Sequence, residues 1–134
     1  MLDKKLIKAY TNTQYIVKSP AVNIRIGNKC PDVDKLLVEN GLTDWAFITA
    51  YNPKSNCYSR EMNEFLHKQL IKSTSKYTSY EGYGKGEDDS WQREVSLLVL
   101  GISKEEAKVI GEIFDQNAIV VGSLSSKAKL LIID

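Results

Sequence analysis

The fold of this chain is decided by the stretch Trp45-Ala46-Phe47-Ile48-Thr49-Ala50-Tyr51-Asn52-Pro53. From Trp45 to Tyr51, larger side chains alternate with smaller ones, as they do in a strand that is packed on both faces. The alanines would let a helix pack closely on one face. Because Asn52-Pro53 is typical of a turn, the stretch predicts a buried central strand over 45–51 that stops there.

Length and charge limit the protein class. At 134 residues the chain is long enough for one domain with a real core, and we expect a single domain over 1–134. Eighteen Lys and Arg against 17 Asp and Glu give a formal net charge of +1. Such a balance creates no general field that attracts nucleic acid or an anionic membrane. We therefore expect neither partner.

The cysteines and the histidine indicate whether the chain binds a metal and in which compartment it lies. Cys30 and Cys57 lack a CxxC partner, and His67 is the single histidine, so the chain lacks the pattern of a Cys/His metal site. We expect no metal, no cofactor, and free thiols in a reducing, cytoplasmic location. The apolar run 95–100 is broken by Ser96 and is far shorter than the roughly 20 residues of a membrane span.

Periodicity and turn residues predict the elements in chain order. Pro31 and Gly41 bracket a helix, Ser59 can cap another, and Ser103 to Glu106 form a capping box. The expected helices are 3–11, 31–40, 59–75 and 103–115; the expected strands are 14–18, 22–27, 45–51, 77–80, 94–101, 118–121 and 128–133.

From Trp45 onward, the order strand, helix, strand, strand, helix, strand predicts a fold of the α+β class. It is the order of a ferredoxin-like split β-α-β core, with an antiparallel sheet and both helices on one face. The strands 45–51 and 94–101 would be its central neighbours. Residues 1–44 would form an N-terminal helix-hairpin-helix extension packed on the 45–134 core.

This topology would gather the ends of several elements on one rim of the sheet. Functional groups are commonly placed on such loops above a rigid scaffold. Glu94 stands out because it enters a buried strand and a buried carboxylate needs a partner, for which Arg25 is a candidate. The alternative is that the amides are ordinary turn and cap residues. The candidate ligand-binding residues are Arg25, Thr49, Asn52, Asn63, Trp91, Glu94, Gln116 and Asn117.

Two other features have competing interpretations. The stretch Glu81 to Asp89 carries three glycines at alternate positions, but it lies between two strands and is acidic. We interpret it as a mobile hairpin loop rather than a phosphate-binding loop, which would lead into a helix. His67 is interpreted as a structural residue at a helix flank rather than a catalytic one.

The sequence resembles the DUF3293 family, small bacterial proteins without an assigned function. The resemblance rests on the segments 9–15, 24–27, 45–53 and 114–120, on Asn63, on the loop 82–86 and on Trp91 with Glu94. Two positions depart from the family pattern, which commonly has proline at Val95 and glycine at Asp115. The resemblance supports the choice of residues above and implies no activity.

Three function hypotheses follow. The first is a rim site for a small polar or anionic ligand, with Glu94 as its only plausible acid or base. The second is a protein-interaction module that presents Tyr58, Tyr77, Tyr80 and Tyr83 and has no ligand site. The third, nucleic-acid binding, is disfavoured by the neutral charge and by the lack of an RNA-recognition signature. No nucleophile–base pair is visible, and we leave both the catalytic residues and the oligomeric state open.

Overall fold

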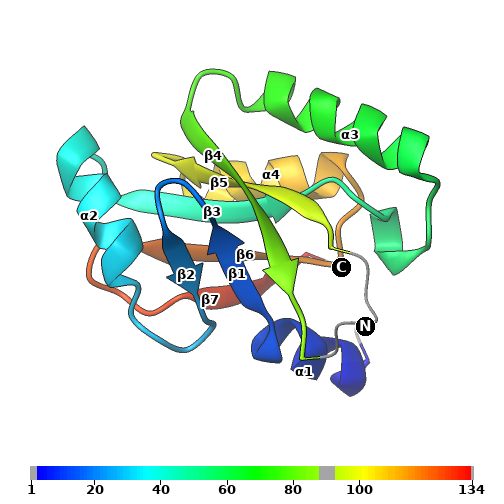
Figure 1. Ribbon diagram of the computed structural model, residues 1–134, viewed down its shortest axis with the longest axis horizontal. Helices are drawn as coiled ribbons and strands as arrows, with labels where there is room; N and C mark the ends of the chain where they lie inside the picture. The colour runs from blue at the N-terminus through cyan, green and yellow to red at the C-terminus, as the bar shows by residue number, and fades with distance from the viewer. Residues whose placement is uncertain (1–2, 88–92, 134) are drawn as a thin grey trace.

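A computed structural model describes residues 3–87 and 93–133, and within these ranges the chain forms one mixed sheet-and-helix structure (Figure 1). Seven described strands make one antiparallel sheet in the order β2-β1-β4-β5-β3-β6-β7. The strands are β1 (Gln14–Val17), β2 (Val22–Ile24), β3 (Asp44–Thr49), β4 (Thr78–Lys85), β5 (Val95–Leu100), β6 (Ala118–Ser123) and β7 (Lys129–Ile132).

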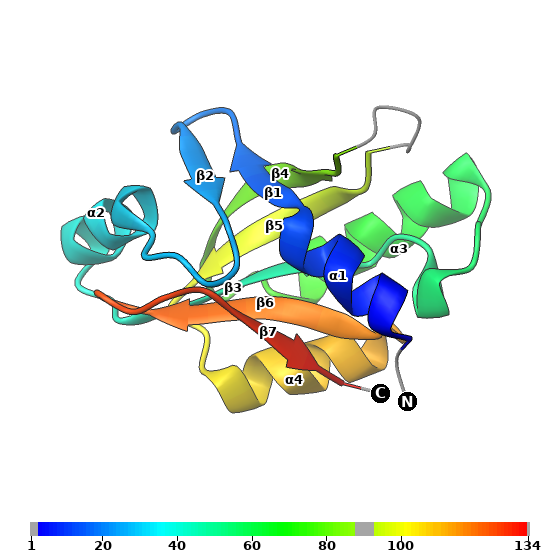
Figure 2. The same cartoon turned by 90° about the horizontal axis from the view of Figure 1, so that it is seen from below.

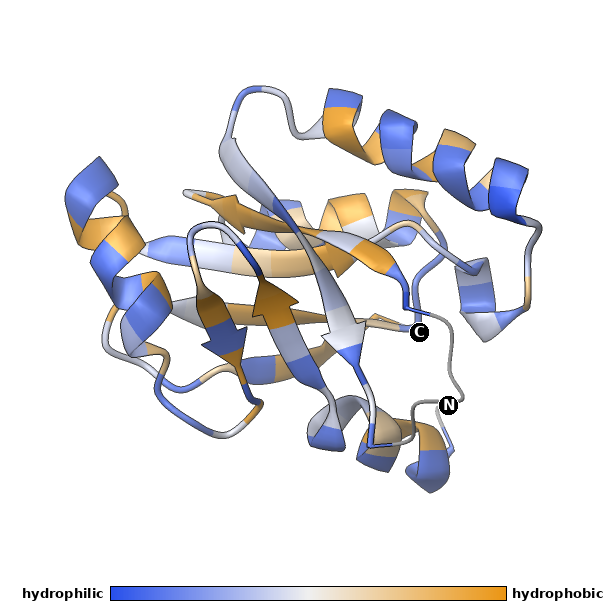
Figure 3. Cartoon of the chain, in the orientation of Figure 1, coloured by the Kyte–Doolittle hydropathy of each residue, from blue (hydrophilic) through white to orange (hydrophobic). Residues whose placement is uncertain are grey.

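The predicted central strand is confirmed in β3, which lies between β5 and β6. Trp45 pairs with Leu100 and Thr49 with Ser96, so β3 and β5 are antiparallel neighbours as predicted. Figure 3 shows these inner strands as largely apolar, consistent with burial on both faces.

The sheet curls so that its two edges approach each other. Figure 2 shows β1 and β2 folded over β6 and β7. Beyond the edge strands, Ile26 pairs with Ala128, and the Gly27 N–H donates to the Ala128 carbonyl at 2.8 Å. The inner face of the curl carries an apolar core that includes Trp45, Phe47 and Leu98.

The helices cover the remaining surfaces. The helices α3 (Arg60–Ser73) and α4 (Lys104–Ile113) pack on the outer face of the sheet, where Leu70 and Ala107 join Ala46 and Ile48 in a second core. The helix α2 (Pro31–Asn40) contributes Val33, Leu36 and Leu37 to the inner core. The helix α1 (Lys4–Asn12) lies by the rim where β3 ends. None of the described helices has the length and apolarity needed to cross a membrane.

Two predictions about the strands were wrong. Residues 81–85, predicted as loop, belong to β4, which pairs with both β1 and β5. Glycine stands at position 82 of this strand because a Cβ there would clash with the Ile16 carbonyl and press on Phe47. The segment 14–24 is not a separate extension hairpin, because β1 pairs with β4 over Gln14–Val17 and joins the same sheet.

Candidate functional site

Three side chains from three segments meet where β3 ends. Asn52 follows β3, Asn63 lies in the first turn of α3, and Glu94 immediately precedes β5. The Asn52 Nδ2 donates to Glu94 Oε2 at 2.8 Å, and the Asn63 Nδ2 donates to Asn52 Oδ1 at 2.9 Å. Asn63 Oδ1 accepts from the Asn52 backbone N–H at 2.9 Å. The rim predicted from element order thus brings these three residues together.

The turn after β3 has an uncommon backbone. Asn52, Lys54 and Ser55 all have positive φ, at 47°, 55° and 60°. Side chains disfavour this left-handed region, at a cost of order 1 kcal/mol for each such residue. Contacts from other elements hold the turn: the Lys54 N–H donates to the Asp115 carbonyl at 2.7 Å, and the Asn63 amide bonds both the backbone N–H and the side-chain Oδ1 of Asn52.

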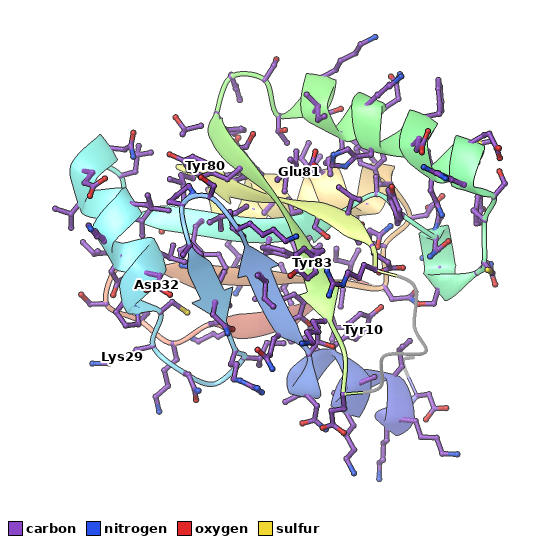
Figure 4. The ribbon with its side chains drawn as sticks, in the orientation of Figure 1. Tyr10, Lys29, Asp32, Tyr80, Glu81 and Tyr83 are labelled. Atoms are coloured by element: carbon purple, nitrogen blue, oxygen red, sulfur yellow. The ribbon has the colours of Figure 1, made fainter. Side chains whose placement is uncertain are left out.

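Ser55 is the centre of a second group of contacts on the same turn. Its Oγ accepts from Asn117 Nδ2 at 2.9 Å and lies 3.5 Å from the Tyr10 hydroxyl. Figure 4 shows Tyr10 on α1, at this end of the molecule. The Tyr15 hydroxyl donates to the Tyr10 carbonyl at 2.7 Å, which fixes α1 to β1. Five segments therefore converge here: α1, the turn after β3, α3, the start of β5 and the α4–β6 connection.

Gln116 has a supporting role at this rim. It is 6% exposed, and its Nε2 donates to the carbonyls of Tyr51 and Phe114 at 3.1 and 3.2 Å. It thereby ties the α4–β6 connection to the end of β3. Thr49 acts similarly, since its hydroxyl donates to the Val95 carbonyl at 2.8 Å.

The electrostatics of the rim centre on Glu94. Burial raises the pKa of this carboxyl above its ordinary value of 4.5, and the hydrogen bond from Asn52 opposes that rise. The Glu94 charge in turn contributes to raising the pKa of Tyr10 and of Tyr15, although burial is the main cause for both. The two hydroxyls therefore lie within the field of the carboxylate and remain protonated at neutral pH.

Arg25 does not act as the predicted partner of Glu94. It is exposed, next to the end of the edge strand β2, while Asn52 makes the hydrogen bond to the carboxylate. Arg93, which directly precedes Glu94, places its guanidinium 4.4 Å from the centre of the Tyr83 ring on β4. The prediction for Trp91 concerns a position outside the described residues.

His67 lies one helical turn beyond Asn63 and is 8% exposed. Its Nε2 is 3.3 Å from Glu81 Oε2 on β4, and its ring packs edge-on against Tyr51, with centroids 6.2 Å apart. Its Nδ1 is buried without a hydrogen-bond partner in the described structure. The residue is thus more buried than the flank position that we predicted.

A hollow of about 280 Å³ lies at the other end of β3, between the start of α4 and the edge strand β7. Asp44, Lys104 and Lys129 contribute to its lining. It does not contain the polar network just described. We place the candidate site at the rim because polar groups from several segments converge there on Glu94, whose pKa is raised by burial.

A family model described as "Protein of unknown function (DUF3293)" matches residues 48–119, which is more than half of the chain. The chain belongs to this family. No curated protein and no solved structure matches it. The DUF3293 match contains Asn52, Asn63, Glu94 and Asn117, and it excludes Tyr10 and Arg25.

Sequence reasoning missed Tyr10, Tyr15 and Ser55. Tyr10 and Tyr15 lie in segment 9–15, one of those that resemble the family, so the sequence did mark them. Their position at the rim, however, depends on the pairing of β1 with β4. Ser55 had no signal, because its contacts follow from the left-handed backbone of the turn. The amide pair Asn52–Asn63 was correctly expected to lie on the rim.

Proposed function

We propose that the rim binds a small polar ligand through Glu94 and the side chains around it. The observation that carries this proposal is the state of Glu94: a half-buried carboxyl, bonded by one amide and surrounded by hydroxyl and amide groups from other segments. A structural acid of this kind is normally compensated by several donors or by a cation. A ligand is a natural source of the missing contacts.

The turn supports the same proposal. Strained non-glycine residues cluster at binding and catalytic sites, where surrounding contacts hold them in place. Three of them lie within the four residues 52–55, and Asp115, which contacts the turn, is a fourth at φ 51°. We propose binding rather than chemistry, because the exposed Cys57 lies outside this network and the His67 Nε2 faces Glu81.

A thermal-shift screen with small polar compounds of both charges and of none tests the proposal. A ligand of the rim should raise Tm in a concentration-dependent way, by the linkage between binding and folding. Glu94→Gln should abolish the rise. Glu39→Gln is the matched control, because Glu39 is exposed on α2, a helix that packs on the inner core. A rise that survives Glu94→Gln would show that the ligand binds elsewhere.

A second candidate function, a protein-interaction surface, is favoured by the outer helices. Met62 and Phe65 on α3 are 44% and 56% exposed, and Val109 and Ile113 on α4 are 54% and 61% exposed. The tyrosine surface predicted from sequence is replaced by these residues, since only Tyr58 of the four tyrosines is exposed. Light scattering on concentrated wild type and Phe65→Asp tests it: a dimer that the substitution dissociates would support it, and a monomer in both would exclude self-association.

We also infer that residues 44–123 are a ferredoxin-like unit within a single domain. The support is the order β4-β5-β3-β6, with α3 and α4 on a common face. The two cysteines are free, and the burial of Cys30 raises its pKa to about 11. Free thiols favour a cytoplasmic location.

A further inference from the structure

The hydrogen-bond inventory of the rim is unbalanced toward acceptors. Glu94 Oε2 accepts from Asn52, whereas Glu94 Oε1 has no donor among the described residues. Asn117 is 8% exposed; its Nδ2 donates to Ser55, and its Oδ1 accepts no bond in the described structure. A carboxylate offers about four lone-pair positions and an amide oxygen two. The rim therefore presents acceptors that a ligand with N–H groups would satisfy.

The charges around Glu94 are unbalanced in the same direction. The side chains of α1, β1 and the turn after β3 that join the hydrogen-bond network are the neutral Tyr10, Tyr15, Asn52 and Ser55. Burial raises the pKa of Glu94, and among the described groups only the Asn52 amide lowers it. A nearby cation would have lowered it as well.

Two basic residues and the histidine that lie near the rim residues in sequence contact other groups. Arg60 binds Glu64 at 2.9 Å, and the Arg93 guanidinium lies over the Tyr83 ring. The sole histidine, His67, faces Glu81 at 3.3 Å. The backbone of Lys54 is held by the Asp115 carbonyl, and its side chain is exposed. Burial is the main cause of the raised pKa of Tyr51; the charges of Glu64, Glu81 and Glu94 add to the rise, and that of Arg60 opposes it.

We propose that the ligand of this rim carries a cationic N–H donor, an ammonium or guanidinium group, that binds the Glu94 carboxylate. The inference rests on the function proposed above and narrows it: the anionic ligand allowed by the sequence would meet the Glu94 carboxylate, which repels it. A cationic donor instead forms a charge-assisted hydrogen bond with Glu94 and offsets the desolvation cost of the partly buried carboxylate. Asn117 and the Tyr10 hydroxyl supply neutral acceptors beside it.

A matched set of four-carbon probes tests the charge preference: butylammonium, butylguanidinium, butanamide and butyrate. The four share one alkyl chain and differ in head group. Each is titrated into the full chain at neutral pH and low salt while the side-chain NH2 resonances of Asn52 and Asn117 are followed by NMR. Concentrations up to about 50 mM cover the millimolar affinity expected of a single charged group.

The expected result is saturable shifts with butylammonium and butylguanidinium, weaker shifts with butanamide and none with butyrate. Glu94→Gln should weaken the cationic probes by about tenfold or more, as loss of a charge-assisted bond predicts. Glu39→Gln should leave them unchanged. Lowering the pH of the wild type through the pKa of Glu94 should also weaken binding of the cationic probes, because the carboxylate becomes neutral. This measurement keeps the test valid if Glu94→Gln does not fold.

Three outcomes overturn the proposal and are distinguishable. Saturable shifts with butyrate or butanamide, and none with the cations, would leave the ligand site standing and refute its charge preference. Cationic shifts of equal size in Glu94→Gln, or cationic affinity unchanged at low pH, would refute the role of Glu94. Absence of shifts with all four probes would refute the cationic preference and, together with a negative thermal-shift screen, the ligand site itself.

Discussion

Asn63→Ala is the substitution that tests most directly whether the α3 amide holds the turn at the rim. Asn63 is 5% exposed and makes two hydrogen bonds of 2.9 Å with Asn52, one through each end of its amide. Each such bond contributes about 1 kcal/mol net, and the Asn52 N–H is left without its acceptor, whereas Asn52 Oδ1 keeps the Tyr58 N–H at 3.0 Å. The third contact, 3.5 Å to the Tyr58 carbonyl, adds little at that length.

Helix propensity acts in the opposite direction. Alanine is favoured over asparagine inside a helix by about 0.5 kcal/mol. The net expectation is a loss of about 2 kcal/mol in the free energy of unfolding. With an unfolding entropy of about 2.1 cal/mol/K per residue over 134 residues, that loss lowers Tm by about 7 °C.

The assay is urea unfolding followed by far-UV circular dichroism, with wild type, Asn63→Ala and Lys68→Ala compared. Lys68 is exposed on the same helix, so its substitution measures the propensity term without the network. Asn63→Asp should also destabilise, and more at pH 7 than at pH 4, because a carboxylate would replace the donor that faces Asn52 Oδ1. A loss for Asn63→Ala below about 0.5 kcal/mol, or equal to that of Lys68→Ala, would refute the reasoning.

Three further predictions concern charge, packing and backbone. Burial raises the pKa of Glu94 above its ordinary value in the folded chain, so the folded state binds this proton more tightly and stability falls as pH rises between the two values. Wild type should therefore lose stability relative to Glu94→Gln between about pH 4 and pH 7 in urea unfolding, and a constant difference would contradict the raised pKa. Gly122→Ala should destabilise by about 1–3 kcal/mol or more, because a Cβ there would clash with the buried indole of Trp45; an unchanged urea midpoint would contradict this packing. Asp115→Gly should stabilise or leave stability unchanged, because residue 115 has φ 51°, and a calorimetric Tm drop of several degrees would contradict the strain assigned to it.

The sequence predicted the rim better than it predicted the sheet. Element ends are marked by local signals, such as Ser59 and Ser103, whose side chains both cap helices as expected. Once β3 and β5 are neighbours, the positions of Asn52 and Glu94 follow from chain direction. The segment around Gly82 was predicted as loop because glycine is common in loops. Here the missing side chain makes room for the Ile16 carbonyl and for Phe47, which lie on other strands.

Long-range pairing explains the residues that were misplaced. Arg25 was considered as a partner of Glu94 because a buried carboxylate needs a hydrogen-bond or charge partner. However, Arg25 follows β2, an edge strand that pairs with β1. Tyr10 reaches the rim because β1 joins β4, a pairing that no local pattern encodes. Asp115 is a different case: its φ of 51° lies in the region that glycine adopts without steric cost, which agrees with the departure noted at this position.

The cost of the rim to the fold is the strongest argument that it has a function. Away from the rim, positive φ is taken by Gly27, Gly41 and Gly101, where glycine bears no steric penalty, and by one other residue, Ser125. At the rim, by contrast, Asn52, Lys54 and Ser55 are held in the same region with side chains present. The adjacent Glu94 is held in a half-buried position with one described donor. A fold under selection for stability alone would relieve both costs, with glycine in the turn and a neutral residue at position 94. Their joint presence at one point on the surface supports the proposed site, in which an acid with one described donor is held in a fixed position.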